Sequence, residues 1–372
     1  MSVVALPQTT KVGEICELRY GKSLPKSKRR QGRVPVFGSN GIVGMHDAAL
    51  STGKTIVIGR KGSIGEIHLS DEACWPIDTT YYIDDASTDA DVGWLAYALK
   101  RLHLKDLNRA AAVPGLNRED VYRLQIVVPS SDEQLRIAKV LDFAQSLIDA
   151  QRETVSLFDE LLQSIFVETF GDPLSNANDW PIGTIGELLA AADYGTSKSA
   201  GQEGALPVLR MGNLTAQGRV DMTDLKYMDI TADEISRYTV QAGDVLFNRT
   251  NSPKLVGKTA IYEGSTPVAY AGYLIRLRVK PPHRAEYLKG FLNTAYSKQT
   301  LREMCKSIVG MANINATELQ EMSIPVPPPH LQLQYAKRVA SAERQRQLRL
   351  DQLKRLETLS SSLQSRVFGG EF

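Results

Sequence analysis

The stretch VPGLNREDVYRLQIVVP, residues 113–129, decides the fold because the chain carries a second copy of its pattern, MANINATELQEMSIPVP, at residues 311–327. In each copy an asparagine, Asn117 or Asn315, precedes a short polar run and an apolar stretch that ends in proline. The same spacing continues to a Phe-Gly pair further along each half. A repeat of this kind predicts two homologous halves.

Each copy occupies the same place in an ordered set of predicted elements. A glycine-rich stretch with short strand patterns, such as Thr55–Ile58 and Asp244–Phe247, comes first. A short helix pattern follows at residues 92–104 and at residues 285–301, ahead of the repeated motif. The second half carries extra residues in its first part. Strands and helices mixed in this order predict an α+β (mixed α/β) fold for both halves.

A long helical run follows each copy, at about residues 132–170 and about residues 330–368. Apolar residues in both runs keep the 4-3 spacing of a heptad seam, with polar interruptions in the second run. The first seam contains Ile137, Leu141, Ala144, Ile148, Val155, Phe158, Leu162 and Ile165; the second contains Val339, Ala342, Leu353, Leu356, Leu363 and Val367, interrupted by Arg346, Arg349 and Ser360. We expect two long antiparallel helices that form a coiled coil between the globular halves, with pseudo-twofold symmetry. The alternative is that each run packs on its own half.

These patterns predict four parts: a globular domain at residues 1–131, a spacer helix at 132–172, a second globular domain at 173–329 and a second spacer helix at 330–372.

Composition and termini narrow the class of protein. The formal net charge is +2, and Cys16, Cys74 and Cys305 lie far apart, which argues against a disulfide framework or a CxxC metal site. The N-terminal residues do not follow a signal-peptide pattern, and no apolar run approaches the ~20 residues of a membrane span. We expect a cytoplasmic protein without a membrane association.

Catalytic signatures are missing from the sequence. The tripeptides at Gly53–Thr55 and Gly257–Thr259 lack the upstream glycine of a phosphate-binding loop, and the histidines lack metal-ligand spacing. We therefore expect no catalysis, no metal and no cofactor bound by this chain. An enzyme with unrecognised motifs, such as a nuclease or a methyltransferase, stays open as an alternative.

The segment RYGKSLPKSKRRQGR, residues 19–33, holds seven Lys or Arg residues and no acid, so it can neutralise DNA phosphates. Two glycine-flanked polar loops follow it, and Arg and Asn side chains suit guanine and adenine edges. The candidate DNA-binding residues of the first half are Arg19, Tyr20, Lys22, Ser23, Lys26, Lys28, Arg29, Arg30, Ser39, Asn40, Arg60, Lys61 and Ser63.

The second half has polar residues at matching places, but their identities differ from those of the first half. Two domains that recognise different DNA sequences require such a difference. RMGN at residues 210–213 stands where the first half has FGSN at 37–40, and FNRTNSPK at 247–254 stands where it has IGRKGS at 58–63. The candidates are Tyr194, Thr196, Ser197, Lys198, Arg210, Asn213, Asn248, Arg249, Thr250, Asn251 and Lys254. The alternative is a coiled-coil scaffold whose polar loops are only solvated.

Together these motifs resemble the specificity subunit of type I restriction–modification systems. The resemblance rests on the repeated asparagine motifs, on the helix start EQLRIA at residues 133–138, and on PVFGSNGIVG at 35–44, IGRKGSIG at 58–65 and WPIDTTYY at 75–82. The segment HLQ at residues 330–332 departs from the family pattern, because it lacks the usual Glu before Gln.

The resemblance implies two target recognition domains, each reading one half of a split sequence in double-stranded DNA. It also implies two modification subunits that methylate adenine and two ATP-driven restriction subunits, with S-adenosylmethionine, ATP and Mg on those partners. A helix of roughly 35 residues spans roughly 50 Å, or about 15 base pairs, so the helices fit the role of a spacer.

Overall fold

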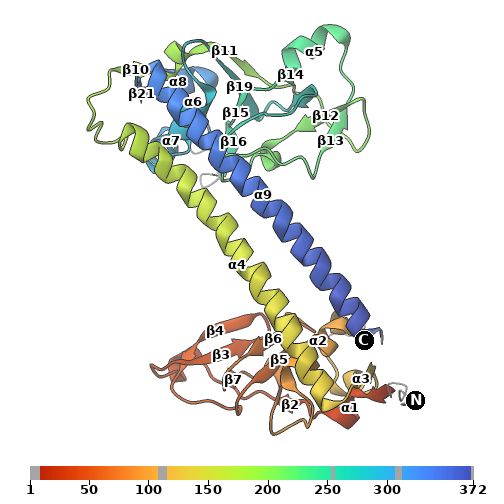
Figure 1. Ribbon diagram of the computed structural model, residues 1–372. Helices are drawn as coiled ribbons and strands as arrows, with labels where there is room; N and C mark the ends of the chain where they lie inside the picture. Colours follow the sequence, from red (N-terminus) through yellow and green to blue (C-terminus); the bar gives the residue numbers. More distant parts are fainter. Residues whose placement is uncertain (1–8, 108–114, 253–255, 306–311, 370–372) are drawn as a thin grey trace. The chain divides into compact units, whose positions relative to one another are not determined.

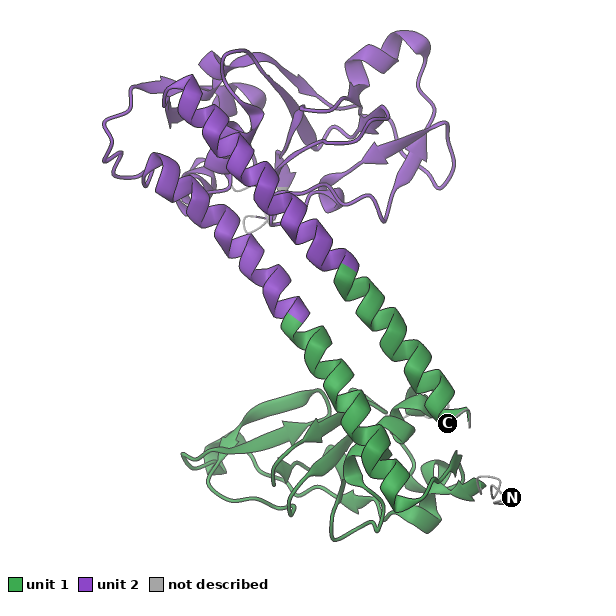
Figure 2. Cartoon of the chain, in the orientation of Figure 1, with its two compact units in different colours: residues 1–150, 352–372 green, residues 151–351 purple. Residues whose placement is uncertain are grey.

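The computed structural model describes residues 9–107, 115–252, 256–305 and 312–369 (Figure 1). These residues form two compact units, shown in different colours in Figure 2. Unit 1 contains Met1–Ala150 and Gln352–Phe372, and unit 2 contains Gln151–Asp351. Each unit therefore includes part of both long helices, α4 (Ser131–Phe170) and α9 (Pro329–Phe368), whose predicted positions are confirmed.

Unit 1 is built on a four-stranded antiparallel sheet and a smaller three-stranded sheet. The larger sheet has the order β2 (Arg19–Tyr20), β8 (Thr80–Asp84), β5 (Thr55–Gly59), β6 (Ile67–Ser70); the smaller has β4 (Gly41–His46), β3 (Val34–Gly38), β7 (Trp75–Pro76). A two-stranded ribbon joins β1 (Thr9–Lys11) to β9 (Gln125–Val127). The helices of this unit outside the long pair are α1 (Val12–Ile15), α2 (Val92–Arg101) and α3 (Arg118–Tyr122).

Helix α2 packs its apolar face on the larger sheet of unit 1. The side chain of Asp91 caps the helix by accepting a hydrogen bond from the Trp94 amide at 2.7 Å. Trp94 and Leu99 are fully buried in the same cluster as Ile56 of β5 and Ile83 of β8. Each such side chain contributes on the order of 2 kcal/mol by leaving water. Helix α2 ends at Arg101, before the predicted end at residue 104, because His103 adopts a positive φ of 47°.

Unit 2 repeats this arrangement. Its larger sheet has the order β11 (Leu189–Tyr194), β19 (Leu274–Val279), β15 (Val245–Asn248), β17 (Thr259–Ile261); its second sheet has β13 (Lys226–Met228), β12 (Leu206–Leu209), β18 (Val268–Tyr270), β14 (Thr239–Val240). Two ribbons pair β10 (Ile182–Thr184) with β21 (Ser323–Pro325) and β16 (Thr250–Asn251) with β20 (Ala312–Asn313). The shorter helices are α5 (Ala232–Tyr238), α6 (Ala285–Leu292), α7 (Ala295–Met304) and α8 (Ala316–Glu321).

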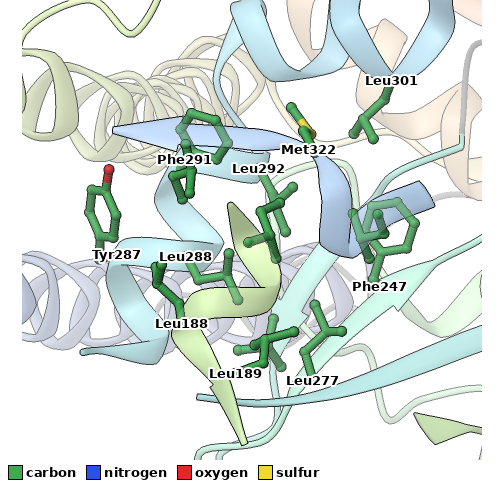
Figure 3. Packing of buried hydrophobic residues seen from close by; sticks show 14 of the residues in the cluster. Leu188, Leu189, Phe247, Leu277, Tyr287, Leu288, Phe291, Leu292, Leu301 and Met322 are labelled. Carbon is green, nitrogen blue, oxygen red and sulfur yellow. The ribbon is translucent and has the colours of Figure 1, made fainter. Parts of the chain in front are cut away.

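The core of unit 2 lies between its larger sheet and α6. Figure 3 shows Leu288, Phe291 and Leu292 of α6 near Phe247 of β15 and Leu277 of β19. All five side chains are completely buried. The α6 face thus plays the same part here that the α2 face plays in unit 1.

The predicted helix at residues 285–301 is wrong as a single element, because it is two helices. Helix α6 ends at Leu292, and the Thr294 side chain caps the start of α7 by accepting from the Ser297 amide at 3.2 Å. A threonine that caps in this way competes with continuation of the preceding helix.

Strand register relates the two units residue by residue. In unit 1, Ile58 pairs with Tyr81, which also pairs with Tyr20. In unit 2, Phe247 pairs with Ile275, which also pairs with Tyr194. The predicted match of 58–63 with 247–254 is therefore confirmed at its first residue. Helix α5 and strand β14, between β13 and β15, hold extra residues of the second half.

The heptad seam of α4 is confirmed by burial. Every seam residue of α4 is buried or half-buried, with Leu141 at 2% and Ile165 at 4% exposure. In unit 1, Ile137 and Leu141 share a core cluster with Val367 of α9. In unit 2, Phe166 packs edge-on against Tyr335 of α9 with ring centroids 5.7 Å apart.

Ion pairs show that α4 and α9 run antiparallel within unit 2. Arg338 contacts Glu168 at 2.6 Å, and Arg346 contacts Asp159 at 3.0 Å, so the contacts progress in opposite directions along the two helices. Arg346 is one of the polar residues that interrupt the second seam. Its guanidinium is accommodated there because Asp159 of the facing helix neutralises it.

Candidate nucleic-acid interface

In unit 1, Tyr20 and Arg60 lie together where β2 and β5 leave the larger sheet. The guanidinium carbon of Arg60 lies 5.3 Å from the centroid of the Tyr20 ring and 5.9 Å from that of Tyr81. Tyr20 is 54% exposed. Arg60 donates one hydrogen bond, from Nη2 to the Asp78 carbonyl at 2.7 Å. An arginine held over an exposed aromatic ring keeps its remaining N–H donors available for phosphate oxygens or base edges.

Arg118 joins this group from a different element. Its guanidinium carbon lies 5.6 Å from the ring centroids of both Tyr20 and Tyr122. It is the first residue of α3, directly after Asn117, whose side chain caps the helix by accepting from the Glu119 amide at 2.9 Å. Arg118 was missed from the sequence, although its place after the repeated asparagine was a usable signal.

The phenol of Tyr81, next to Tyr20 and Arg60, adds no charge to this group. Burial and the nearby Tyr20 raise the pKa of Tyr81 to about 12, so this phenol is neutral near pH 7. Its hydroxyl donates to the Leu116 carbonyl at 3.1 Å.

Unit 2 has the same pair at the equivalent place. The Arg249 guanidinium carbon lies 4.8 Å from the centroid of the Tyr194 ring, which is 42% exposed. The Ile314 amide donates to the Arg249 carbonyl at 3.0 Å, as the Leu116 amide donates to the Arg60 carbonyl at 2.9 Å. The Tyr–Arg pair is therefore a shared feature of both units, built on the same backbone.

The basic segment of unit 1 is only partly free. Arg19 lies in β2 and contacts Glu17 at 3.2 Å and Asp84 at 3.4 Å. Arg29 folds back and donates to the Val43 carbonyl at 2.6 Å. Arg30 is exposed but pairs with Asp47 at 2.8 Å. The remaining exposed candidates of the segment are Lys22, Ser23, Lys26 and Lys28, and the basic residue Arg33 is exposed as well.

The two loops that follow in unit 1 are held together by Ser39. Its hydroxyl is buried within hydrogen-bonding distance of the Lys61 carbonyl at 2.5 Å and the Thr79 carbonyl at 2.8 Å. Asn40 and Lys61 are exposed on either side, and Ser63 is half-buried. Ser39 thus positions the loops, and Asn40 and Lys61 are the side chains that face solvent.

Most candidates of unit 2 are used inside the unit. Asn213 is buried and donates to the carbonyls of Asp221 at 3.0 Å and Asp224 at 2.9 Å. Arg210 contacts the Asp224 carboxylate at 3.1 Å, and Lys198 pairs with Glu234 at 2.6 Å.

The remaining candidates of unit 2 differ in exposure. Thr196, Thr250 and Asn248 are buried, whereas Ser197 is exposed. The backbone of Asn251 lies in β16, and Lys254 lies outside the described residues. Tyr194, Ser197 and Lys198, which pairs with Glu234, are thus the exposed members of the predicted set, and Arg249 is half-buried over the Tyr194 ring.

The described residues offer neither a metal site nor a membrane-spanning helix. They contain no group of three or more His, Cys, Asp or Glu side chains placed to hold a metal ion. None of their helices has the length and apolar character to cross a membrane.

The family model of the type I restriction modification DNA specificity domain matches residues 7–154 and, a second time, residues 177–358. The chain belongs to this family. Two specificity domains of mixed helix and sheet agree with the fold that the resemblance implied.

Curated relatives are named as specificity subunits of type I restriction enzymes. The putative MjaX specificity subunit of Methanocaldococcus jannaschii is 31% identical over 163 residues, which cover 43% of this chain and 38% of the relative. The EcoKI specificity subunit of Escherichia coli K12 is 22% identical over 294 residues, which cover 74% of this chain and 63% of the relative. The chain spans less than two thirds of the length of these relatives.

Solved structures share the fold along the whole chain. The S subunit of a type I restriction–modification system from M. genitalium superposes with a TM-score of 0.64 at 15% identity, over 99% of this chain and 97% of that one. A chain from a structure of the assembling type I restriction–modification system gives a TM-score of 0.57 at 15% identity, over 99% of both chains.

Proposed function

We propose that the chain is a DNA-binding specificity subunit that catalyses no reaction itself. Each unit reads one half of a bipartite target in double-stranded DNA, and α4 and α9 set the spacing of the two halves. The observation that carries this proposal is the Tyr–Arg pair at the same backbone position in both units, next to loops whose polar residues differ.

The shared and the divergent residues suit two kinds of DNA contact. Contacts to phosphates position a protein on the duplex, whereas contacts to base edges carry the sequence information. The Tyr20–Arg60 and Tyr194–Arg249 pairs suit the first task because they occur in both units. Asn40 and Lys61 suit the second, because Asn and Lys side chains can contact adenine and guanine edges and both are exposed.

The partners are modification and restriction subunits. We propose that two modification subunits bring S-adenosylmethionine and methylate adenine, and that two restriction subunits, where present, bring ATP and Mg. The chain binds none of these cofactors and acts in the cytoplasm, where the genome is accessible.

An exposed apolar stripe on α4 supports the docking of modification subunits. In unit 1, Phe143 is 64% exposed and Leu147 is 41% exposed; in unit 2, Leu157 is 55% exposed and Leu161 is 43% exposed. These residues keep heptad spacing on a side of α4 other than the seam with α9. A partner helix that packs there removes apolar side chains from water.

Reconstitution tests the proposal. The purified chain is mixed with its modification subunits, labelled S-adenosylmethionine and genomic DNA, and the methylated positions are mapped. We expect methylation at one bipartite sequence only when all proteins are present, and none with either component alone. Methylation by the isolated chain, or methylation by the modification subunits at the same sites without it, would contradict the proposal.

A further inference from the structure

The loop after β15 in unit 2 begins and ends with the same backbone hydrogen bonds as the loop after β5 in unit 1. The Gly59 amide donates to the Glu66 carbonyl at 2.8 Å, and the Asn248 amide donates to the Lys258 carbonyl at 2.9 Å. Both loops close with one more matching bond, from Gly65 to the Gly59 carbonyl and from Gly257 to the Asn248 carbonyl, each at 2.8 Å. Glu66 and Lys258 therefore occupy the same position with opposite charge.

In unit 1 the charge at this position is neutralised. Lys105, in the short 3-10 helix Leu104–Leu107 that follows α2, places its ammonium 2.6 Å from the Glu66 carboxylate. The pair is 38% exposed at Glu66 and 62% exposed at Lys105. An exposed pair of this kind adds little stability, but it leaves no net charge for a ligand.

In unit 2 the equivalent place has two lysines, Lys258 in the loop and Lys298 against it. Lys298 of α7 donates to the Gly257 carbonyl, directly before Lys258. The Lys258 ammonium donates to the Leu214 carbonyl at 2.7 Å and contacts the Met211 carbonyl at 3.5 Å. Neither lysine forms an ion pair with any residue that the structure describes.

The positive charges of this cluster oppose one another. Burial, together with the charges of Arg302 and Lys258, lowers the pKa of Lys298 to about 8. Burial also lowers the pKa of Lys258. Arg302 follows on α7 one turn after Lys298 and is exposed. An anion at this place would favour the charged lysines and offset their mutual repulsion.

Asn248, whose backbone amide bonds to the Lys258 carbonyl, has side-chain hydrogen-bonding groups without a partner in the described part of the chain. It stands where unit 1 has Gly59, its side chain is fully buried, and both polar atoms of its amide lack a partner in the described part of the chain. Buried polar groups without partners are rare, and a bound ligand is one explanation.

We propose that Lys258, Lys298 and Arg302 form a binding site for a backbone phosphate of the DNA that unit 2 reads. Unit 1 makes no such contact, because Glu66 and Lys105 neutralise each other there. The inference rests on the proposed function. Because every duplex carries phosphates, this contact adds affinity without adding sequence preference.

The test replaces the lysine by the residue that unit 1 has at the same position. Lys258→Glu supplies a carboxylate that Lys298 can pair with, as Glu66 pairs with Lys105, so the loop should keep its fold. Lys258→Gln removes the charge alone. Each full-length variant is reconstituted with the modification subunits, and its Kd for the target duplex and for an unrelated duplex is measured between about 50 and 200 mM salt.

We expect the slope of log affinity against log salt to become shallower by about 1 with Lys258→Gln and by about 2 with Lys258→Glu. The ratio of affinities for target and unrelated DNA should stay the same. The reciprocal variant Glu66→Lys, which gives unit 1 two unpaired lysines, should steepen the slope by about 1.

Unchanged slopes in both Lys258 variants, with melting temperatures equal to that of the unaltered protein, would overturn the inference. A changed sequence preference with an unchanged slope would also overturn it, because the lysine would then contact a base. If Lys258→Glu lowers the melting temperature, Lys258→Gln and Arg302→Gln decide by the same measurement. If the unaltered protein shows no sequence preference, the proposed function itself is wrong. If the unaltered protein shows the preference and only the slopes fail to change, the phosphate site alone is wrong.

Discussion

Arg60 is the residue where the two units agree most closely, so its replacement tests the shared contact. We expect Arg60→Ala to weaken binding of target and unrelated duplexes alike by about 10-fold, because a charge-assisted bond to phosphate contributes about 1.5 kcal/mol or more. Arg60→Lys should recover part of the loss, since it keeps the charge but not the planar guanidinium. Fluorescence anisotropy at fixed salt measures both variants.

The control for Arg60 is Arg123→Ala. Arg123 is 76% exposed in the same unit and pairs only with Asp120 on α3 among the contacts described for it. Its loss should change the affinity by less than 2-fold, within the effect of one exposed ion pair. A loss for Arg60→Ala confined to one DNA sequence would mean that Arg60 reads a base and is not a positioning residue.

Sequence patterns predicted the Tyr–Arg pairs better than they predicted which neighbouring polar residues face solvent. Tyr20 and Arg60 were predicted and lie together, because glycines on either side of a loop mark the turn that brings them to one edge of the sheet. Ser39 and Asn213 belong to the same kinds of loop, yet both turn inward and bind backbone carbonyls. Inward-facing and outward-facing polar residues occur in the same kind of glycine-containing loop. The local sequence therefore does not distinguish them, and only the tertiary structure shows which of them face solvent.

At the scale of elements, the exposed stripe of α4 makes a prediction about assembly. We expect the double variant Phe143→Ser and Leu147→Ser to weaken association with the modification subunit by about 10- to 100-fold, because each buried apolar side chain is worth about 1.5–3 kcal/mol. Analytical ultracentrifugation of the mixed proteins measures this change. The melting temperature of the isolated chain should stay the same, since both residues are exposed.

Leu359→Ser is the matched control for the α4 stripe. Leu359 is 65% exposed on α9. The exposed positions that would continue a heptad series from it, Arg355 and Ser362, are polar, so Leu359 is not part of an apolar stripe. Its replacement should leave the association intact. Equal losses for both variants would mean that the effect is general and that the α4 stripe is not the docking surface.

The long helices were predictable because a heptad seam repeats many times along the sequence, so its period can be recognised without knowledge of the tertiary contacts. The break between α6 and α7 was not predicted, because residues 285–301 keep apolar residues at helical spacing across it. The break depends on the Asn293–Thr294 pair, where a cap competes with helix continuation. Helix α5 and strand β14 were likewise not predicted. The comparison of the two halves showed that the second half has extra residues, but not which secondary structure they form.

At the scale of the whole molecule, unit 1 is compact in space but consists of two separate stretches of the sequence, Met1–Ala150 and Gln352–Phe372. Unit 1 takes its core from both ends of the chain, since Val367 is 8% exposed in the same cluster as Ile137 and Leu141. Leu363 and Phe368 pack against that cluster. An exchange of the first recognition domain between relatives must therefore respect the C-terminal turns of α9.

Two chimeras test this organisation together with the division of labour between the units. One takes residues 1–150 from a relative with a different target; the other takes residues 1–150 and residues 352–372 from the same relative. Reconstituted with the modification subunits, both should direct methylation to a sequence in which only one half of the target has changed, because unit 2 is intact in both. The first chimera should unfold at a lower temperature by several degrees, since mismatched packing at Leu363 and Val367 costs about 1–3 kcal/mol. Differential scanning fluorimetry and methylation mapping measure the two effects separately. A change in both halves of the target would refute the assignment of one half-site to each unit, whereas equal melting temperatures would refute only the shared core.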